Sequence, residues 1–314
     1  MPAKGEIVAL LTTLSWSICM FPFTVAARKL GANVLNHLRL LMAVFLLTLI
    51  LIIGFSFSPS DLFTAAGSRQ WLWLGISGIT GLTIGDYFAF RSMSLLGPRM
   101  SSVFSTMAPM AALFAGMALL DESLNLPGIA GMLITLAGVT WLGFSKNDPA
   151  VVHLSAKERW SGLLFAFLSP VCQGAGLAFA RYGLEHGDTD AELLPIHAAW
   201  MRMCIATASL FLLSFFTGRF RSVYRQLHEK KGAGTGAAFL GTVFGPVAGV
   251  SLSMFAIALI PASVAQTIFS LVPVFVTVIA FAFWRERISW TSVIAMLVSV
   301  AGVILLVRRN DLGF

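Results

Sequence analysis

Long apolar runs separated by short polar stretches fill almost the whole chain. A helix needs about 20 apolar residues to cross the hydrocarbon core of a bilayer. Ten runs have that length, at residues 6–27, 34–54, 70–90, 100–120, 126–144, 160–180, 195–217, 237–260, 264–284 and 289–307. Strands of a membrane barrel would alternate apolar and polar residues, whereas these runs are continuous. The pattern therefore predicts an all-α integral membrane fold with ten transmembrane helices.

The composition supports a membrane-embedded chain. Hydrophobic residues make up 57% of the sequence and charged residues 11%, whereas a soluble globular protein carries roughly 25% charged residues. The mean hydropathy is +0.86. So few polar residues could not cover the surface of a soluble domain, and disorder requires low hydrophobicity. We expect a multi-pass protein of the plasma or inner membrane, in contact with lipid.

The net charge of +7 comes from basic residues that lie mainly in short loops, where they act as topology determinants. No basic cluster is interleaved with aromatic residues on a polar face, so we expect no nucleic-acid partner. The loops opposite the termini hold fourteen Lys and Arg residues, and the side of the termini holds five. Because basic loops favour the cytoplasm, this count places both termini outside.

The two halves of the sequence repeat one another. A shift of 164 residues aligns 81–142 with 245–306 without a gap and gives 12 identities in 62 positions. The informative matches are Gly81 and Gly85 with Gly245 and Gly249, Pro109 with Pro273, and Glu122 with Glu286. We therefore predict one five-helix repeat at 1–144, a polar linker at 145–159 and a second five-helix repeat at 160–314.

An odd number of helices in each repeat makes the second copy enter the membrane from the opposite side. The repeats are then inverted, as in many secondary transporters, which bind their substrate near the midplane between the halves. This step from architecture to transport is an analogy.

Both copies also share a signature of a proline, a glutamate thirteen residues later and Gly-Val sixteen residues after that. It occurs as Pro109, Glu122 and Gly138-Val139, and again as Pro273, Glu286 and Gly302-Val303. The signature resembles the EamA branch of the drug/metabolite transporter superfamily, and the likeness extends over essentially the whole chain. It implies a ten-helix exporter or importer of small metabolites, driven by an ion gradient or by exchange. Members of that family are commonly drawn with cytoplasmic termini, opposite to the charge count.

Asp86 is the only acidic residue well inside a predicted span. A carboxylate is costly to bury in lipid, so Asp86 should face the interior, either protonated, paired or in a wet cavity. Because burial favours the protonated form of a carboxyl group, Asp86 is our candidate site for a coupling proton. The alternative is a static ion pair with Arg39 or Arg91.

Other polar or aromatic side chains inside the spans are candidates for the substrate pathway, namely Arg39, Arg202, Gln173, Gln266 and Trp16. Either arginine could bind an anionic group or extend to lipid head groups. The glutamines could hydrogen-bond a substrate or join helices, and Trp16 could line a cavity or fill the core. We expect His37 and His197 near the membrane interface.

Glycines and prolines predict how the helices pack and bend. Gly81 with Gly85, and Gly245 with Gly249, place two small residues on one helix face and allow close approach, either static or at a moving interface. Pro109 and Pro273 lie in mid-span, where each should kink its helix and act as a hinge or a fixed bend. Glu122 and Glu286 should serve as caps or interfacial anchors.

No enzyme signature, nucleotide-binding loop or metal-binding spacing occurs, so we expect no enzyme activity, cofactor or metal. The predicted function is secondary active transport of amino-acid-like or other small organic compounds by alternating access, coupled to protons at Asp86. The alternative is a structural subunit or receptor that reuses the fold without transport. The expected partners are a small-molecule substrate, lipid and a proton, in a monomer or a homodimer.

Overall fold

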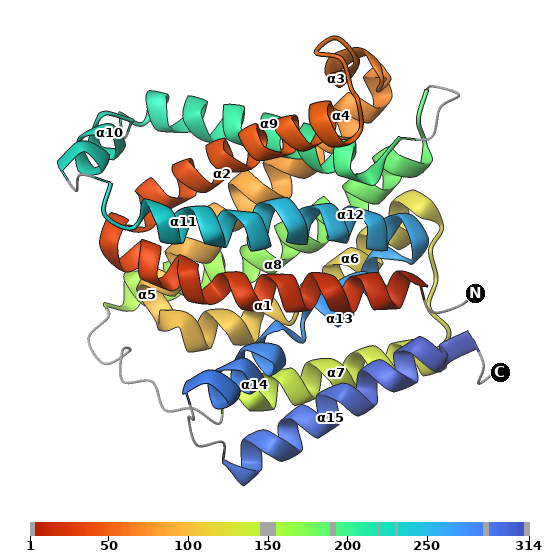
Figure 1. Ribbon diagram of the computed structural model, residues 1–314. Coiled ribbons are helices and arrows are strands. Elements are labelled where there is room, and N and C mark those ends of the chain that lie inside the picture. Colours follow the sequence, from red (N-terminus) through yellow and green to blue (C-terminus); the bar gives the residue numbers. More distant parts are fainter. Residues whose placement is uncertain are drawn as a thin grey trace.

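A computed structural model describes residues 4–144, 155–188, 193–218, 220–229, 232–284 and 289–310. All the regular elements in these ranges are helices, and they form one bundle with both termini at the same end (Figure 1). The first half contains α1 (Lys4–Leu30), α2 (Ala32–Leu49), η1 (Ile50–Gly54), α3 (Asp61–Thr64), α4 (Ser68–Ser77), η2 (Gly78–Gly85), α5 (Asp86–Ser105), α6 (Ala108–Leu120) and α7 (Leu126–Phe144). The second contains α8 (Ala156–Glu185), α9 (Pro195–Phe216), α10 (Phe220–Glu229), α11 (Thr235–Thr242), η3 (Val243–Gly249), α12 (Val250–Leu259), α13 (Ala262–Phe269), α14 (Val272–Trp284), α15 (Trp290–Val307) and η4 (Arg308–Asn310).

Nine helical stretches of the described residues are long and apolar enough to cross a membrane, and they correspond to nine of the ten predicted runs. The tenth run, 70–90, is helical through α4, η2 and the start of α5, but it does not reach the same apolarity. It packs against α8 and α9, and its glycines let those helices approach closely. A helix that neighbouring helices shelter from lipid needs fewer aliphatic side chains, which explains the lower apolarity of this run. The nine apolar helices confirm the all-α membrane fold, while the count of ten transmembrane helices stays a prediction.

The first helices of the two halves run in opposite directions. A Cβ on Gly5, at the start of α1, would touch the side chain of Ile260. Arg181, near the end of α8, donates a hydrogen bond to the carbonyl of the same Ile260. The start of α1 and the end of α8 therefore lie at one end of the bundle, as inverted repeats require.

The predicted glycine pairs lie in helices that pack against the opposite half of the protein. η2 of the first half packs on α8 of the second, and η3 of the second packs on α1 of the first. A Cβ on Gly176 of α8 would lie 2.9 Å from the backbone nitrogen of Gly81, and one on Gly85 would lie 3.1 Å from Gln173 Cγ. On the other side, a Cβ on Gly245 would lie 2.9 Å from the ring of Phe23. Both pairs thus serve close packing between the halves.

The last helices of the halves, α7 and α15, pack side by side (Figure 1). A Cβ on Gly131 would lie 2.8 Å from the carbonyl oxygen of Gly302, and a Cβ on Gly302 would lie 2.8 Å from that of Gly131. The repeat partner of Gly302, Gly138, faces Ser299 in the same interface.

Pro109 and Pro273 each follow a two-residue turn inside one apolar stretch, 103–120 or 262–283, where the sequence predicts a kink. Each is the second residue of its helix, α6 or α14, and the preceding helix ends at Ser105 or Phe269. Proline is tolerated in the first turn because its missing N–H needs no partner there. At the second break, Thr13 Oγ1 donates to the carbonyl of Ile268, at 3.1 Å.

Candidate functional site

A cavity of about 360 Å³ lies between the halves and is lined by α1, α2, η2, α5, α8, α9, η3, α12, α13 and α14. All six side chains chosen from the sequence as pathway candidates line it: Trp16, Arg39, Asp86, Gln173, Arg202 and Gln266. They come from six different helices. Their common position follows from the rule that polar side chains in a membrane bundle face the interior.

Asp86 forms an ion pair with Arg39, so α5 and α2 are joined by opposite charges at the cavity wall. The Arg39 side chain is 17% exposed and that of Asp86 18%. Arg39 Nε also donates to Asn36 Oδ1, at 2.8 Å, and its guanidinium lies 5.8 Å from the centre of the Phe90 ring. The other partner considered for Asp86, Arg91, instead lies over the Phe165 ring.

Arg202 is buried in α9, two turns from its start, and is 4% exposed. Its Nη1 contacts the sulfur of Met254 at 3.3 Å, and its Nη2 lies beside Gly81. Among the residues that the structure describes, Nε has no hydrogen-bond partner, and no carboxylate lies within ion-pair distance of the guanidinium. Arg202 therefore does not extend to lipid head groups.

Both glutamines line the cavity, and among the described residues their side-chain amides make few hydrogen bonds. Gln173 Nε2 makes a long contact of 3.4 Å with Ser169 Oγ. The backbone carbonyl of Gln266 accepts a hydrogen bond from Ser270 near the end of α13, and its side chain lines the cavity beside that break. Both amides can therefore offer hydrogen bonds to a bound molecule.

Trp16 is fixed by two contacts of the second half. Its ring meets the Phe269 ring edge-on, with centroids 4.9 Å apart. A Cβ on Gly249 would collide with the indole, so the absence of a side chain at Gly249 leaves room for the ring. This ties the sequence-predicted glycine pair Gly245 and Gly249 directly to the cavity wall.

Several lining residues were missed from the sequence: Cys19, Met20, Phe23, Leu40, Pro246 and Ser253. All but Pro246 and Ser253 are apolar residues of ordinary membrane helices, so nothing in their type distinguishes cavity from core. Pro246 does carry a signal. It lies with Gly245 in η3, a π-helical stretch within the continuous span 235–259, and π-helical stretches are frequent at functional sites.

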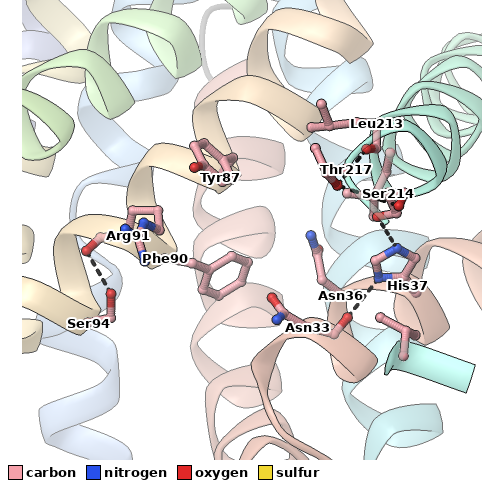
Figure 2. A pocket seen from close by; sticks show the side chains of 12 residues that line it. Asn33, Asn36, His37, Tyr87, Phe90, Arg91, Ser94, Leu213, Ser214 and Thr217 are labelled. Atoms are coloured by element: carbon pink, nitrogen blue, oxygen red, sulfur yellow. Dashed lines mark hydrogen bonds between the residues drawn. The ribbon is translucent and has the colours of Figure 1, made fainter. Parts of the chain in front are cut away.

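A second pocket, of about 430 Å³, is lined by residues of α2, α5, α9 and α10, and α10 lies at the end of the bundle opposite the start of α1 (Figure 1). Tyr87, Phe90 and Arg91 of α5 lie on one side of it, and Asn36 and His37 of α2 lie on the other (Figure 2). We name this pocket the vestibule. Because Arg39 binds Asn36 and covers Phe90, the Arg39–Asp86 pair lies between the vestibule and the central cavity.

The two histidines that the sequence predicts near the membrane interface are buried within the protein. His37 Nε2 is 2.7 Å from Ser214 Oγ, and its Nδ1 is 2.8 Å from the carbonyl of Asn33 (Figure 2). His197 is fully buried, with Nε2 2.9 Å from the carbonyl of Leu62. Both ring nitrogens of His37 thus have polar partners in the bundle, whereas Nδ1 of His197 has none among the described residues.

Charged side chains hold the helices together at the termini end. Arg181 of α8 pairs with Glu122 and with Glu185, both at 2.6 Å, and donates to the carbonyls of Ile257 and Ile260. Burial raises the pKa of Glu122, and the Arg181 guanidinium opposes that rise. Glu122 is thus an anchor between α6 and α8, as expected for a residue at a helix end. Its repeat partner, Glu286, lies outside the described residues.

Within the described ranges, no group of three or more His, Cys, Asp and Glu side chains is arranged to hold a metal ion. The three cysteines, Cys19, Cys172 and Cys204, are free thiols. The side chains that line the cavity offer charge pairing, hydrogen bonding and contact with apolar and aromatic surfaces.

Comparison with known proteins agrees with this architecture. The sequence profile of the EamA-like transporter family matches residues 3–144 and 160–308. An uncharacterized transporter of Haemophilus influenzae is 21% identical over 183 residues, which are 58% of this chain and about half, 55%, of that protein's length. A crystal structure that is 18% identical covers 98% of both chains with a TM-score of 0.68, which shows a shared fold.

Proposed function

Because the chain belongs to the EamA-like transporter family and is a multi-pass membrane transporter, we propose that it carries small organic metabolites by secondary active transport. The cargo, amino-acid-like or another small organic compound, binds in the central cavity. Alternating access of that cavity to the two sides moves it across the membrane, and a proton on Asp86 couples the movement to a gradient.

The position of the cavity supports alternating access. Its wall is built from both halves, which run in opposite directions and interlock through η2 on α8 and η3 on α1. The vestibule lies at one end of the bundle, while the Arg181 ion pairs hold the other end together. Rocking of the halves about such a shared site would exchange which end is open.

The single observation that carries the coupling proposal is the Arg39–Asp86 pair. Asp86 is the only acidic side chain lining the cavity among the described residues. Protonation would cancel its charge and release Arg39, whereas deprotonation restores the pair. One proton would then switch a charged contact between α2 and α5 at the border between vestibule and cavity.

The test is flux in proteoliposomes with a trapped pH dye, to which amino acids and short organic acids are added one at a time. For at least one compound we expect proton movement with the wild-type protein. Asp86→Asn should abolish that movement while labelled compound still exchanges with unlabelled compound. The matched control is Asp121→Asn, an exposed residue with a positive φ that asparagine also tolerates.

Unchanged gradient-driven flux in Asp86→Asn would remove Asp86 from the mechanism. No flux for any compound, from folded wild-type protein, would instead support the alternative of a non-transporting subunit or receptor.

A further inference from the structure

We infer that Arg202 is the receptor for an anionic group of the cargo, so the central cavity takes a small organic acid with an apolar or aromatic body. The inference rests on the proposed function, because it assigns a ligand to the same cavity. It adds the chemical class of the cargo and the residue that selects it.

The first step is the contrast between Arg202 and the other sheltered arginines. Arg39 faces Asp86, Arg181 faces Glu122 and Glu185, and Arg309 faces Glu6 at 3.5 Å. In the described part of the chain, Arg202 is the one arginine of limited exposure that lacks such a carboxylate. An arginine keeps its positive charge at ordinary pH. Arg202 therefore carries a buried charge that no carboxylate of the described residues pairs with.

The second step is the charge of the whole cavity. Its lining contains two positive side chains, Arg39 and Arg202, and one negative side chain, Asp86. Asp86 is near enough to attract Arg202 electrostatically, but its ion pair is made with Arg39. One positive charge therefore remains uncompensated. A buried charge without a partner is strongly unfavourable, and a bound anion with one negative charge would neutralise it.

The third step is the unused hydrogen-bonding capacity of the Arg202 guanidinium. Its Nη1 rests on the Met254 sulfur, a weak acceptor, and Nε has no partner among the described residues. Arg202 lines the cavity, and its Nη2 lies beside Gly81, another lining residue. A carboxylate there could accept two parallel N–H bonds from the guanidinium, the geometry in which arginine binds carboxylates most strongly.

The fourth step is the rest of the cavity. Trp16, Met20, Phe23 and Leu40 contribute apolar and aromatic surface, while Gln173 and Gln266 contribute amide groups. About 360 Å³ is far more than an inorganic ion needs and lies at the lower end of the range of small-molecule pockets. The lining therefore fits an acid group joined to a compact apolar body.

The test measures binding directly, by thermal shift and calorimetry of the purified protein in detergent, with compounds that share a phenyl body. Phenylacetate carries the carboxylate, phenylacetamide is its neutral analogue, phenylphosphonate carries another anionic group, and sodium chloride supplies an inorganic anion. We expect phenylacetate or phenylphosphonate to bind, and phenylacetamide and chloride to bind at least 10-fold more weakly or not at all. Equal binding of the acid and the amide, or equal effects of chloride, would overturn the inference.

The variants separate recognition from structural support. Arg202→Gln should weaken binding of the acid by about 10- to 100-fold, the range for losing hydrogen bonds to a charged group, and Arg202→Lys should weaken it less. Because Arg202→Gln removes an uncompensated buried charge, the melting temperature of the ligand-free protein should not fall. The matched control Arg69→Gln changes an exposed arginine outside the cavity and should leave binding unchanged. A lower melting temperature with unchanged binding in Arg202→Gln would make Arg202 a structural residue and contradict the inference.

Asp86→Asn distinguishes failure of this inference from failure of proton coupling. The substitution removes the carboxylate that competes for the guanidinium groups, so it should tighten binding of the acid while gradient-driven flux is lost. Tighter binding with normal coupling would refute only the role of Asp86 in transport. Lost coupling with equal affinity for acid and amide would refute only the anion site.

Discussion

At the scale of single residues, charge and hydrogen-bonding capacity decide which side chains matter. Asp86, Arg39 and Arg202 stand out in the sequence because charges are costly inside a membrane, and all three line one cavity. What the sequence could not give was their pairing. By sequence both Arg39 and Arg91 were candidate partners for Asp86, with Arg91 poorly placed five residues on in the same helix. The packing of α2 against the bundle places Arg39 opposite Asp86.

The glutamines provide a residue-scale prediction. Gln266→Leu should reduce affinity for the best bound compound about 5- to 10-fold, the cost of one hydrogen bond, because its amide faces the cavity. The melting temperature should stay nearly unchanged. The matched control is Gln70→Leu. Gln70 is buried and accepts the backbone N–H of Gly67 at 2.9 Å, so its loss should lower stability and leave affinity unaltered. Calorimetry and thermal melting of both variants check this, and reversed effects would refute the assignment.

At the scale of helices, small residues decide how closely the halves approach. The repeated glycines were recognisable from their spacing, and the structure pairs them with helices of the opposite half. The breaks at Pro109 and Pro273 were less predictable. A proline signals a lost backbone hydrogen bond but not which side chain packs beside it. At the second break Thr13 of α1 donates to the carbonyl of Ile268, which also accepts from the N–H of Leu271.

Gly176 gives the prediction at this scale. A Cβ there would lie 2.9 Å from the nitrogen and 3.0 Å from the Cα of Gly81, and backbone atoms cannot move aside as a flexible side chain can. Gly176→Ala should therefore destabilise the protein by about 1–3 kcal/mol. The control Gly236→Ala places its Cβ in open space within α11 and should be neutral or stabilise by up to about 1 kcal/mol. Denaturation in mixed detergent measures the free energy of unfolding of both variants. Equal stability of the two would show that the packing of η2 on α8 does not require this close backbone contact.

At the scale of the whole molecule, the repeat in the sequence was sufficient to predict an all-helical membrane fold with antiparallel halves. The reason is physical, because lipid permits few backbone arrangements and an odd number of spans inverts the second copy. The prediction was weakest for the run 70–90. Its glycines and polar residues lower its apolarity, and they are tolerated there because neighbouring helices cover the run. Burial of His37 and His197 was likewise not predictable, since each depends on a polar partner distant in the sequence.

The central claim is that one cavity between the halves opens to each side of the membrane in turn. Its most direct test is labelling of Leu82→Cys, a cavity position, after replacing Cys19, Cys172 and Cys204 with alanine. Asn33→Cys in the vestibule and the exposed Asp121→Cys report the two faces separately.

A membrane-impermeant thiol reagent should modify Asn33→Cys only from the face opposite the termini and Asp121→Cys only from the face of the termini. The account predicts that Leu82→Cys is modified from both faces in oriented vesicles, and more slowly when a bound compound occupies the cavity. Modification of Leu82→Cys from one face alone, with both reporter positions behaving as stated, would contradict it.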